Sequence, residues 1–171
     1  MNKSLSQNYQ GYFQNYISQV PEENLLDAFN KQTPIISSFL SSIPKSKNLF
    51  AYADGKWTIK EVLQHIIDTE RIMSYRALAF ARKEKNVLTG FDENEYAESS
   101  NGNNRTWQSL GNEFLIVRHS THLLFNSLTE EMLVSEGRWD TNKLNVAGFG
   151  FITLGHFYHH KKIIEERYLG K

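Results

Sequence analysis

The clearest helix in the sequence is TIKEVLQHIIDTERIM, residues 58–73. Thr58 and Glu61 have the spacing of a capping box, in which a hydroxyl and a carboxylate bind backbone amides at the start of a helix. The apolar residues that follow recur at three- and four-residue steps, the period of a helix with one buried face. These residues are Ile59, Val62, Leu63, Ile66, Met73, Ala77 and Phe80. The pattern predicts a helix from Thr58 to about Lys83.

Three further segments have the same period. They run from about Glu22 to Ile43, from about Thr106 to Leu128 and from about Leu144 to Leu169. Pro34 lies inside the first of them, and a proline removes one helical hydrogen bond, so we expect a kink or a break near Thr33. Four helices that each have one apolar face predict an all-α protein, a four-helix bundle.

Two connections between these helices are polar. Residues 86–104 are rich in Asn, Asp, Glu, Ser and Gly. They form a longer connection than most loops inside compact domains, and loops of that length often cover sites. The acidic run in this connection, residues 92–95, lacks the spacing of an EF-hand, so we expect it to be solvated. A second loop is expected to pass through residues 137–140.

The segment before the first predicted bundle helix has a weak helical stripe, which ends at Pro21. Its apolar residues are Tyr9, Phe13, Tyr16, Ile17 and Val20. We therefore expect two parts: a short N-terminal arm, residues 1–20, and the bundle domain on which it docks, residues 21–171.

The composition narrows the functional classes. The chain has 171 residues, 19 Lys and Arg, 19 Asp and Glu, and no cysteine. This length supports a single domain with a full core, and the zero net charge with no basic stripe argues against a nucleic-acid partner. The first residues, MNKSLSQN, contain no apolar signal core, and no segment has the length of a bilayer span. These features predict a cytoplasmic protein with no membrane partner.

Histidines are the strongest candidates for a metal site. His156 and His160 are four residues apart on the last predicted helix, so both imidazoles lie on one face and can bind one ion. His65 lies at the edge of the stripe on the second helix and could be the third ligand. The alternative is that these are core histidines bonded to neighbours or buried water. Because unpaired buried polar groups cost about 1–3 kcal/mol each, a cluster favours a shared partner such as a metal ion.

The other histidines are expected to lie outside the ligand set. His159 is turned about 100° around the helix from His160 and should face a neighbouring helix, water or an interface. His119 should project outward and His122 should lie on a flank, so we expect both at the surface. Asp68 and Thr69, one turn beyond His65, could accept the second N–H of its imidazole.

Three neutral nitrogens would leave open coordination positions, as in catalytic metal sites. A water or thiol bound there would lose its proton more readily and become a nucleophile. All-nitrogen ligation suits zinc, nickel, iron or copper. We expect a divalent metal, with zinc first and nickel or another transition metal as alternatives.

Two blocks of sequence resemble the DinB-like superfamily, in particular its YfiT-like branch. The first is residues 57–71 with residues 75–78 and 90–92, and the second is GHFYHH, residues 155–160, followed by residues 163–169. The resemblance covers about residues 20–170. It implies a four-helix bundle that binds zinc or nickel through His65, His156 and His160. Known members include thiol-dependent S-transferases and isomerases that use low-molecular-weight thiols, and others are described as metal-dependent hydrolases. Many form homodimers.

Two functions follow from these observations. The first is an enzyme with a small-molecule substrate, in which the three-histidine metal site activates a low-molecular-weight thiol for transfer or water for hydrolysis. The second is a non-catalytic bundle that binds a metal or a small molecule. Arg71, Arg76 and Arg118 are candidate anchors for an anionic substrate, although ion-paired or surface roles are the commoner ones for arginine. A homodimer is expected from the resemblance.

Overall fold

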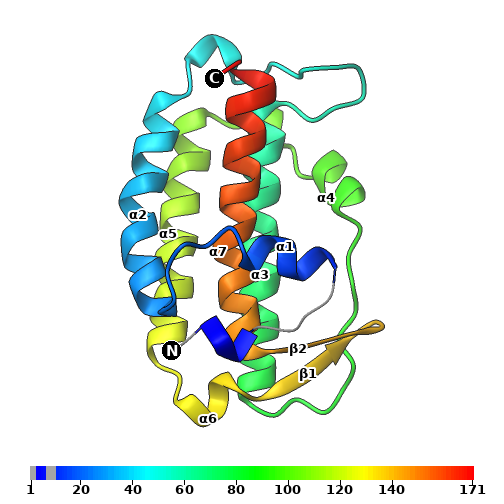
Figure 1. The fold of residues 1–171 in the computed structure, drawn as a ribbon. Coiled ribbons are helices and arrows are strands. Elements are labelled where there is room, and N and C mark those ends of the chain that lie inside the picture. Colours follow the sequence, from blue (N-terminus) through cyan, green and yellow to red (C-terminus); the bar gives the residue numbers. More distant parts are fainter. Residues whose placement is uncertain (1–2, 7–10) are drawn as a thin grey trace.

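The computed structural model describes residues 3–6 and 11–171. Four long helices pack side by side along its length (Figure 1). They are α2 (Leu25–Ser42), α3 (Ile59–Ala81), α5 (Trp107–Asn126) and α7 (Val146–Ile163). In Figure 1, α2 and α7 run in one direction and α3 and α5 in the other. The predicted all-α four-helix bundle is confirmed.

Short elements precede, connect and follow the long helices. They are η1 (Lys3–Ser6), α1 (Tyr12–Ile17), η2 (Lys45–Lys47), α4 (Glu93–Ser99), η3 (Gly102–Asn104), α6 (Glu130–Leu133), β1 (Glu136–Trp139), β2 (Asn142–Asn145) and the π-helical turn η4 (Ile164–Tyr168). The connection over residues 86–104 therefore contains two short helices, α4 and η3. The loop expected at residues 137–140 belongs to an antiparallel hairpin, in which Glu136 pairs with Asn145 and Trp139 with Asn142.

The start of α3 has the predicted capping box. The Thr58 hydroxyl accepts a hydrogen bond from the Glu61 amide at 3.2 Å, and the Thr58 amide donates to the Glu61 carboxylate at 2.7 Å. The helix ends at Ala81, two residues before the predicted end, because Lys83 has a positive φ of 62° that a helix does not allow.

We expected a kink or a break near Thr33. The helix α2 continues through Pro34 from Leu25 to Ser42, so there is no break. Pro34 has no amide to offer the carbonyl of Asn30, but both residues lie on the exposed face of the helix, where water can bind that carbonyl. Phe29 and Ile36, on either side of Pro34 in the sequence, are fully buried on the opposite face and anchor both halves of the helix to the core.

A belt of buried polar side chains divides the core at mid-height. Apolar side chains form one cluster on each side of it. The polar belt consists of Gln32, His65, Thr69, Glu70, Arg118 and His156, with one to three residues from each long helix. Burial of so many polar groups requires that they bind one another or a ligand.

The N-terminal arm packs on the bundle through α1, which lies across α7 (Figure 1). Of the residues expected to dock, Tyr16, Ile17 and Val20 are buried, and Tyr9 lies outside the described residues. The contact is so close at Gly155 of α7 that a Cβ atom there would lie 1.9 Å from the carbonyl oxygen of Tyr16.

We predict that Gly155→Ala displaces α1 from α7. A Cβ atom at 1.9 Å from a backbone oxygen cannot be accommodated, so the arm must move, at a cost of about 1–3 kcal/mol. Denaturant unfolding would measure the loss of stability, and limited proteolysis would show faster cleavage in residues 11–20. Gly111→Ala on α5 is the matched control, because its Cβ would meet Leu40 at an ordinary 3.5 Å. Equal behaviour of the two variants would contradict the prediction.

Among the described residues, no helix combines the length and the apolar character that a membrane span requires.

Candidate metal centre

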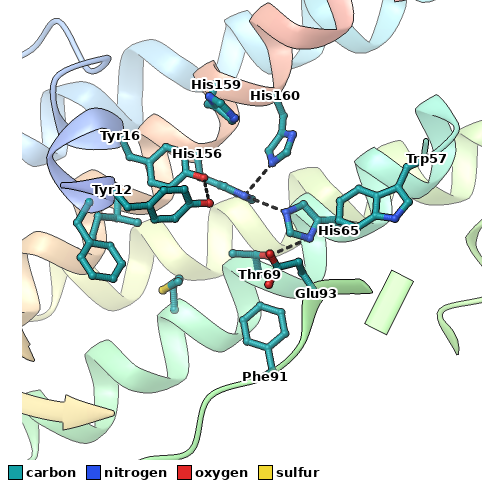
Figure 2. A pocket seen from close by; sticks show the side chains of 13 residues that line it. Tyr12, Tyr16, Trp57, His65, Thr69, Phe91, Glu93, His156, His159 and His160 are labelled. Atoms are coloured by element: carbon teal, nitrogen blue, oxygen red, sulfur yellow. Dashed lines mark hydrogen bonds between the residues drawn. The ribbon is translucent and has the colours of Figure 1, made fainter. Parts of the chain in front are cut away.

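Three imidazoles converge between α3 and α7. The Nε2 atom of His156 lies 3.0 Å from the Nε2 atom of His65 and 3.0 Å from that of His160 (Figure 2). The ligand nitrogens of all three residues lie within 4.8 Å of one another. The structure thus brings together the three histidines selected from the sequence, two of them one helical turn apart on α7 and the third on a different helix.

The surroundings of His65 orient its ring. The Thr69 hydroxyl lies 3.5 Å from Nδ1 of His65, one turn along α3, and the indole of Trp57 packs against the imidazole with ring centres 4.8 Å apart. A proton on Nδ1 that points at Thr69 leaves Nε2 as the free lone pair. Asp68 does not take this role, because its carboxylate accepts a hydrogen bond from Gln64 instead.

Burial keeps these histidines neutral. It lowers the pKa of His65 to about 4, with a smaller contribution from the charge of His159. Burial, followed by the charge of the neighbouring histidines, also lowers the pKa of His156 and of His160 well below the usual range. All three imidazoles are therefore neutral near pH 7, which is the protonation state that binds metal ions.

The donor set fits a divalent transition metal. Two nitrogens that each lie about 2.0–2.1 Å from one zinc ion can be separated by no more than about 4.2 Å. Both separations from His156 are 3.0 Å, and three neutral nitrogens of this kind suit zinc, nickel, copper or iron. Where Nε2 of each ring carries the lone pair, as the contact between Nδ1 and Thr69 favours for His65, three lone pairs meet in a buried site, and one cation would satisfy all three.

A cavity of about 350 Å³ lies over the three histidines. Its lining residues are Tyr12, Phe13, Tyr16, Trp57, His65, Thr69, Met73, Phe91, Glu93, Ile152, His156, His159 and His160. Figure 2 shows these side chains around the imidazoles, with the tyrosines of α1 on one side and Phe91 and Glu93 on another. The N-terminal arm and the long connection before α5 therefore both contribute to the site.

Tyr16 connects the arm to the histidines. Its ring lies edge-on to His156 and to His159, with centres 5.4 and 5.3 Å apart, and its hydroxyl donates a hydrogen bond to that of Tyr12. Burial is the main cause of a raised pKa for Tyr16, and the nearby charge of Glu93 adds to it. Tyr16 is therefore a neutral phenol in the wall of the cavity.

Several lining residues were not singled out in the sequence. Glu93 belongs to the acidic run of residues 92–95, which is exposed as expected, yet Glu93 also borders the cavity. The sequence feature next to Glu93 is the N-cap of α4, where Asp92 accepts hydrogen bonds from the amides of Asn94 and Glu95. This cap marks the start of a helix and gives no indication of a cavity. Trp57 and Phe91 lie in the blocks that resemble the family but were given no role, and no pattern in the sequence marked Tyr12. Only the packing of distant segments brings the three residues to the site.

The remaining histidines and the candidate arginines lie elsewhere. His119 is exposed, but His122 is half-buried and stacks on Phe29, so the expectation of surface exposure is wrong for His122. Arg118 is buried in an ion pair with Glu70. Arg76 donates to the carbonyl of Thr89, and Arg71 pairs with Glu113. None of the three arginines lines the cavity.

Comparison with known proteins identifies the family. The sequence profile of the DinB superfamily matches residues 13–164. One similar solved structure is YfiT from Bacillus subtilis, with a TM-score of 0.73, 16% identity and coverage of 98% of both chains. YfiT is described as a probable metal-dependent hydrolase with an unusual four-helix bundle topology. A mycothiol-dependent maleylpyruvate isomerase is similar with a TM-score of 0.65 and 12% identity, over 89% of this chain and 60% of the isomerase.

No curated protein sequence matches the chain. At these identities the two structures show a shared fold, and the profile match extends over most of the sequence. The chain belongs to the DinB superfamily.

Proposed function

We propose that this protein is a metal-dependent enzyme that acts on a small molecule. His65, His156 and His160 would hold a divalent metal through their Nε2 atoms. The observation that carries the proposal is that these three atoms converge beneath an open cavity of about 350 Å³, large enough for a small organic substrate. A sealed cluster in the core would instead favour a structural metal site or a metal-binding bundle without catalysis.

A divalent ion held by these histidines would lower the pKa of a bound water or thiol and would so supply a nucleophile near neutral pH. The protein's own residues provide the surroundings. Thr69 and Trp57 hold the ring of His65 in place, and the Tyr12 and Tyr16 rings of the arm cover the site from one side. The apolar wall reduces access of bulk water and so strengthens electrostatic interactions with the substrate.

The reaction we propose is transfer of a low-molecular-weight thiol to an electrophile, or hydrolysis. Both would begin with a nucleophile that the ion activates, a thiolate in the transfer reaction and a hydroxide in hydrolysis. The comparisons support this range, because one similar structure is described as a metal-dependent hydrolase and the other as a mycothiol-dependent isomerase. The chain contains no cysteine, so the sulfur of a thiol reaction would come from a cosubstrate. Zinc is the first candidate for the ion and nickel the second.

The proposal predicts activity that depends on the metal. Purified protein is expected to contain about one zinc or nickel ion per chain, and a panel of cellular thiols with a chromogenic electrophile, run beside chromogenic esters, should reveal one reaction. A chelator should abolish the rate and added zinc or nickel should restore it, because the nucleophile forms only at the ion. A rate that the chelator leaves unchanged, or metal-loaded protein that is inactive with every thiol and ester, would contradict the proposal.

A further inference from the structure

Among the described residues, two arginines are buried in the bundle, and only one of them has a carboxylate partner. Arg118 pairs with Glu70. Arg76 on α3 is 3% exposed and forms no ion pair with any described carboxylate. Residues 1–2 and 7–10, outside the described part of the chain, contain no aspartate or glutamate. A counter-ion in direct contact with Arg76 would therefore have to come from outside the chain.

The protein satisfies only part of the Arg76 guanidinium. Its Nη2 atom donates a hydrogen bond to the Thr89 carbonyl at 3.0 Å, and no other described group accepts a hydrogen bond from it. The centres of the Trp139 and Phe91 rings lie 5.1 and 5.9 Å from its central carbon. A guanidinium has five N–H donors in a planar fork, so most of them have no acceptor among the described residues. Burial of a charge with so few partners is costly, and a bound anion would remove that cost.

A second cavity, of about 200 Å³, adjoins this guanidinium. Arg76 is its one lining residue with a formal charge. Most of the other lining residues are apolar or aromatic: Ile72, Tyr75, Leu88, Phe91 and Tyr96. Phe91 also lines the cavity over the histidines, so the two cavities share this ring as a wall. The second cavity is called the Arg76 cavity below.

The loop on one side of the Arg76 cavity is fixed to the hairpin. The Leu88 amide donates to the Arg138 carbonyl, and the Leu88 carbonyl accepts from the Asp140 amide, each at 3.0 Å. The Gly90 amide donates to the Asp140 carboxylate, also at 3.0 Å. Asp140 is exposed and does not line the cavity, and its charge opposes the effect of burial, which lowers the pKa of Arg76. The wall is therefore formed without a ligand, and the guanidinium remains positively charged.

We propose that the Arg76 cavity binds a small carboxylate with an apolar body. The two oxygens of a carboxylate match the planar fork of one guanidinium, and the aromatic and aliphatic side chains suit an apolar body. A phosphate group carries more charge, and the wall offers no second cation to balance it. A metal ion at the histidine site would add positive charge beyond Phe91 and would not oppose the anion. The proposal does not depend on the proposed function.

Benzoate and benzyl alcohol test the proposal, because they are similar in shape and differ in charge. The full chain is first treated with a chelator, so that benzoate cannot bind a metal ion. An NMR titration near neutral pH would then follow the amides of residues 88–91 and the Nε–H signal of Arg76. Benzoate should shift both and should bind at least about tenfold more tightly than benzyl alcohol, the usual effect of a hydrogen bond to a charged group. Inorganic phosphate should bind more weakly than benzoate.

Arg76→Met should remove the preference for benzoate, because it removes the cation and keeps an unbranched side chain. Arg71→Met is the matched control and should keep the preference, since Arg71 lies on the same helix but pairs with Glu113 and does not line the cavity. Equal affinities of benzoate and benzyl alcohol for the unmodified protein, tighter binding of phosphate, or an unchanged preference in Arg76→Met would overturn the proposal. If Arg76→Met does not fold, an Arg76 Nε–H signal that benzoate leaves unshifted in the unmodified protein would overturn it.

Discussion

His156→Ala is expected to abolish metal binding. His156 is the central imidazole, 3.0 Å from each of the other two, and it is only 6% exposed. Its loss leaves two nitrogens on opposite sides of a gap. The metal affinity should fall by more than the roughly 10–100-fold that loss of an outer-shell partner costs. Elemental analysis after dialysis should find metal in the unmodified protein and almost none in the variant.

If His156→Ala loses the metal because a ligand is lost, variants of histidines outside the site should keep the metal. His159→Ala is the sharpest control, since His159 is three residues from His156 on α7 and lines the cavity but is not one of the three converging residues. It should retain the metal, as should His119→Ala at the exposed surface of α5. Thermal unfolding gives a second readout, because added zinc stabilises only a protein that binds it in the folded state. Equal metal content in His156→Ala and the unmodified protein would remove the proposed site.

Arg118→Met is expected to destabilise the fold by about 3–5 kcal/mol, the usual cost of leaving a buried charge without its partner. Arg118 is 1% exposed and Glu70 2%. The guanidinium donates two hydrogen bonds to the Glu70 carboxylate, at 2.9 and 2.8 Å, and a third to the side-chain oxygen of Gln32. Chemical denaturation would measure the shift in midpoint.

Two further variants separate two contributions to the loss of stability: the cost of an unpaired buried charge and the cost of removing an arginine side chain. Arg71→Met breaks the exposed pair with Glu113 and should cost less than about 1 kcal/mol. The double variant Glu70→Met with Arg118→Met removes both buried charges and should recover most of the stability that the single variant loses. A cost for Arg118→Met no larger than that for Arg71→Met would contradict the prediction.

The features that could be predicted are those that depend on residues close together in the sequence. The capping box of Thr58 and Glu61 marks the start of α3 because its hydrogen bonds form within four residues. The spacing of His156 and His160 likewise places both rings on one face of α7. The convergence of His65 on this pair was predicted from its position in an apolar stripe together with the family resemblance, and the structure places the three together.

Other features depend on contacts between distant segments and left no local signal. Arg118 has the same immediate neighbours as many surface arginines, and only the approach of α3 to α5 pairs it with Glu70. The hairpin has strands of four residues, too short for a clear alternation of polar and apolar side chains. The helix α4 has seven residues, mostly polar, so the cap at Asp92 was the sole indication of it.

The order in which the chain is synthesised determines when the metal site can form. His65 and His156 are 91 residues apart. At roughly 5–20 residues per second, a ribosome adds that length in about 5–20 seconds. During this interval the nascent chain holds one imidazole of the three, and α3 has no α7 to pack against. A site built from these three histidines therefore cannot form until α7 has been synthesised and packs against α3.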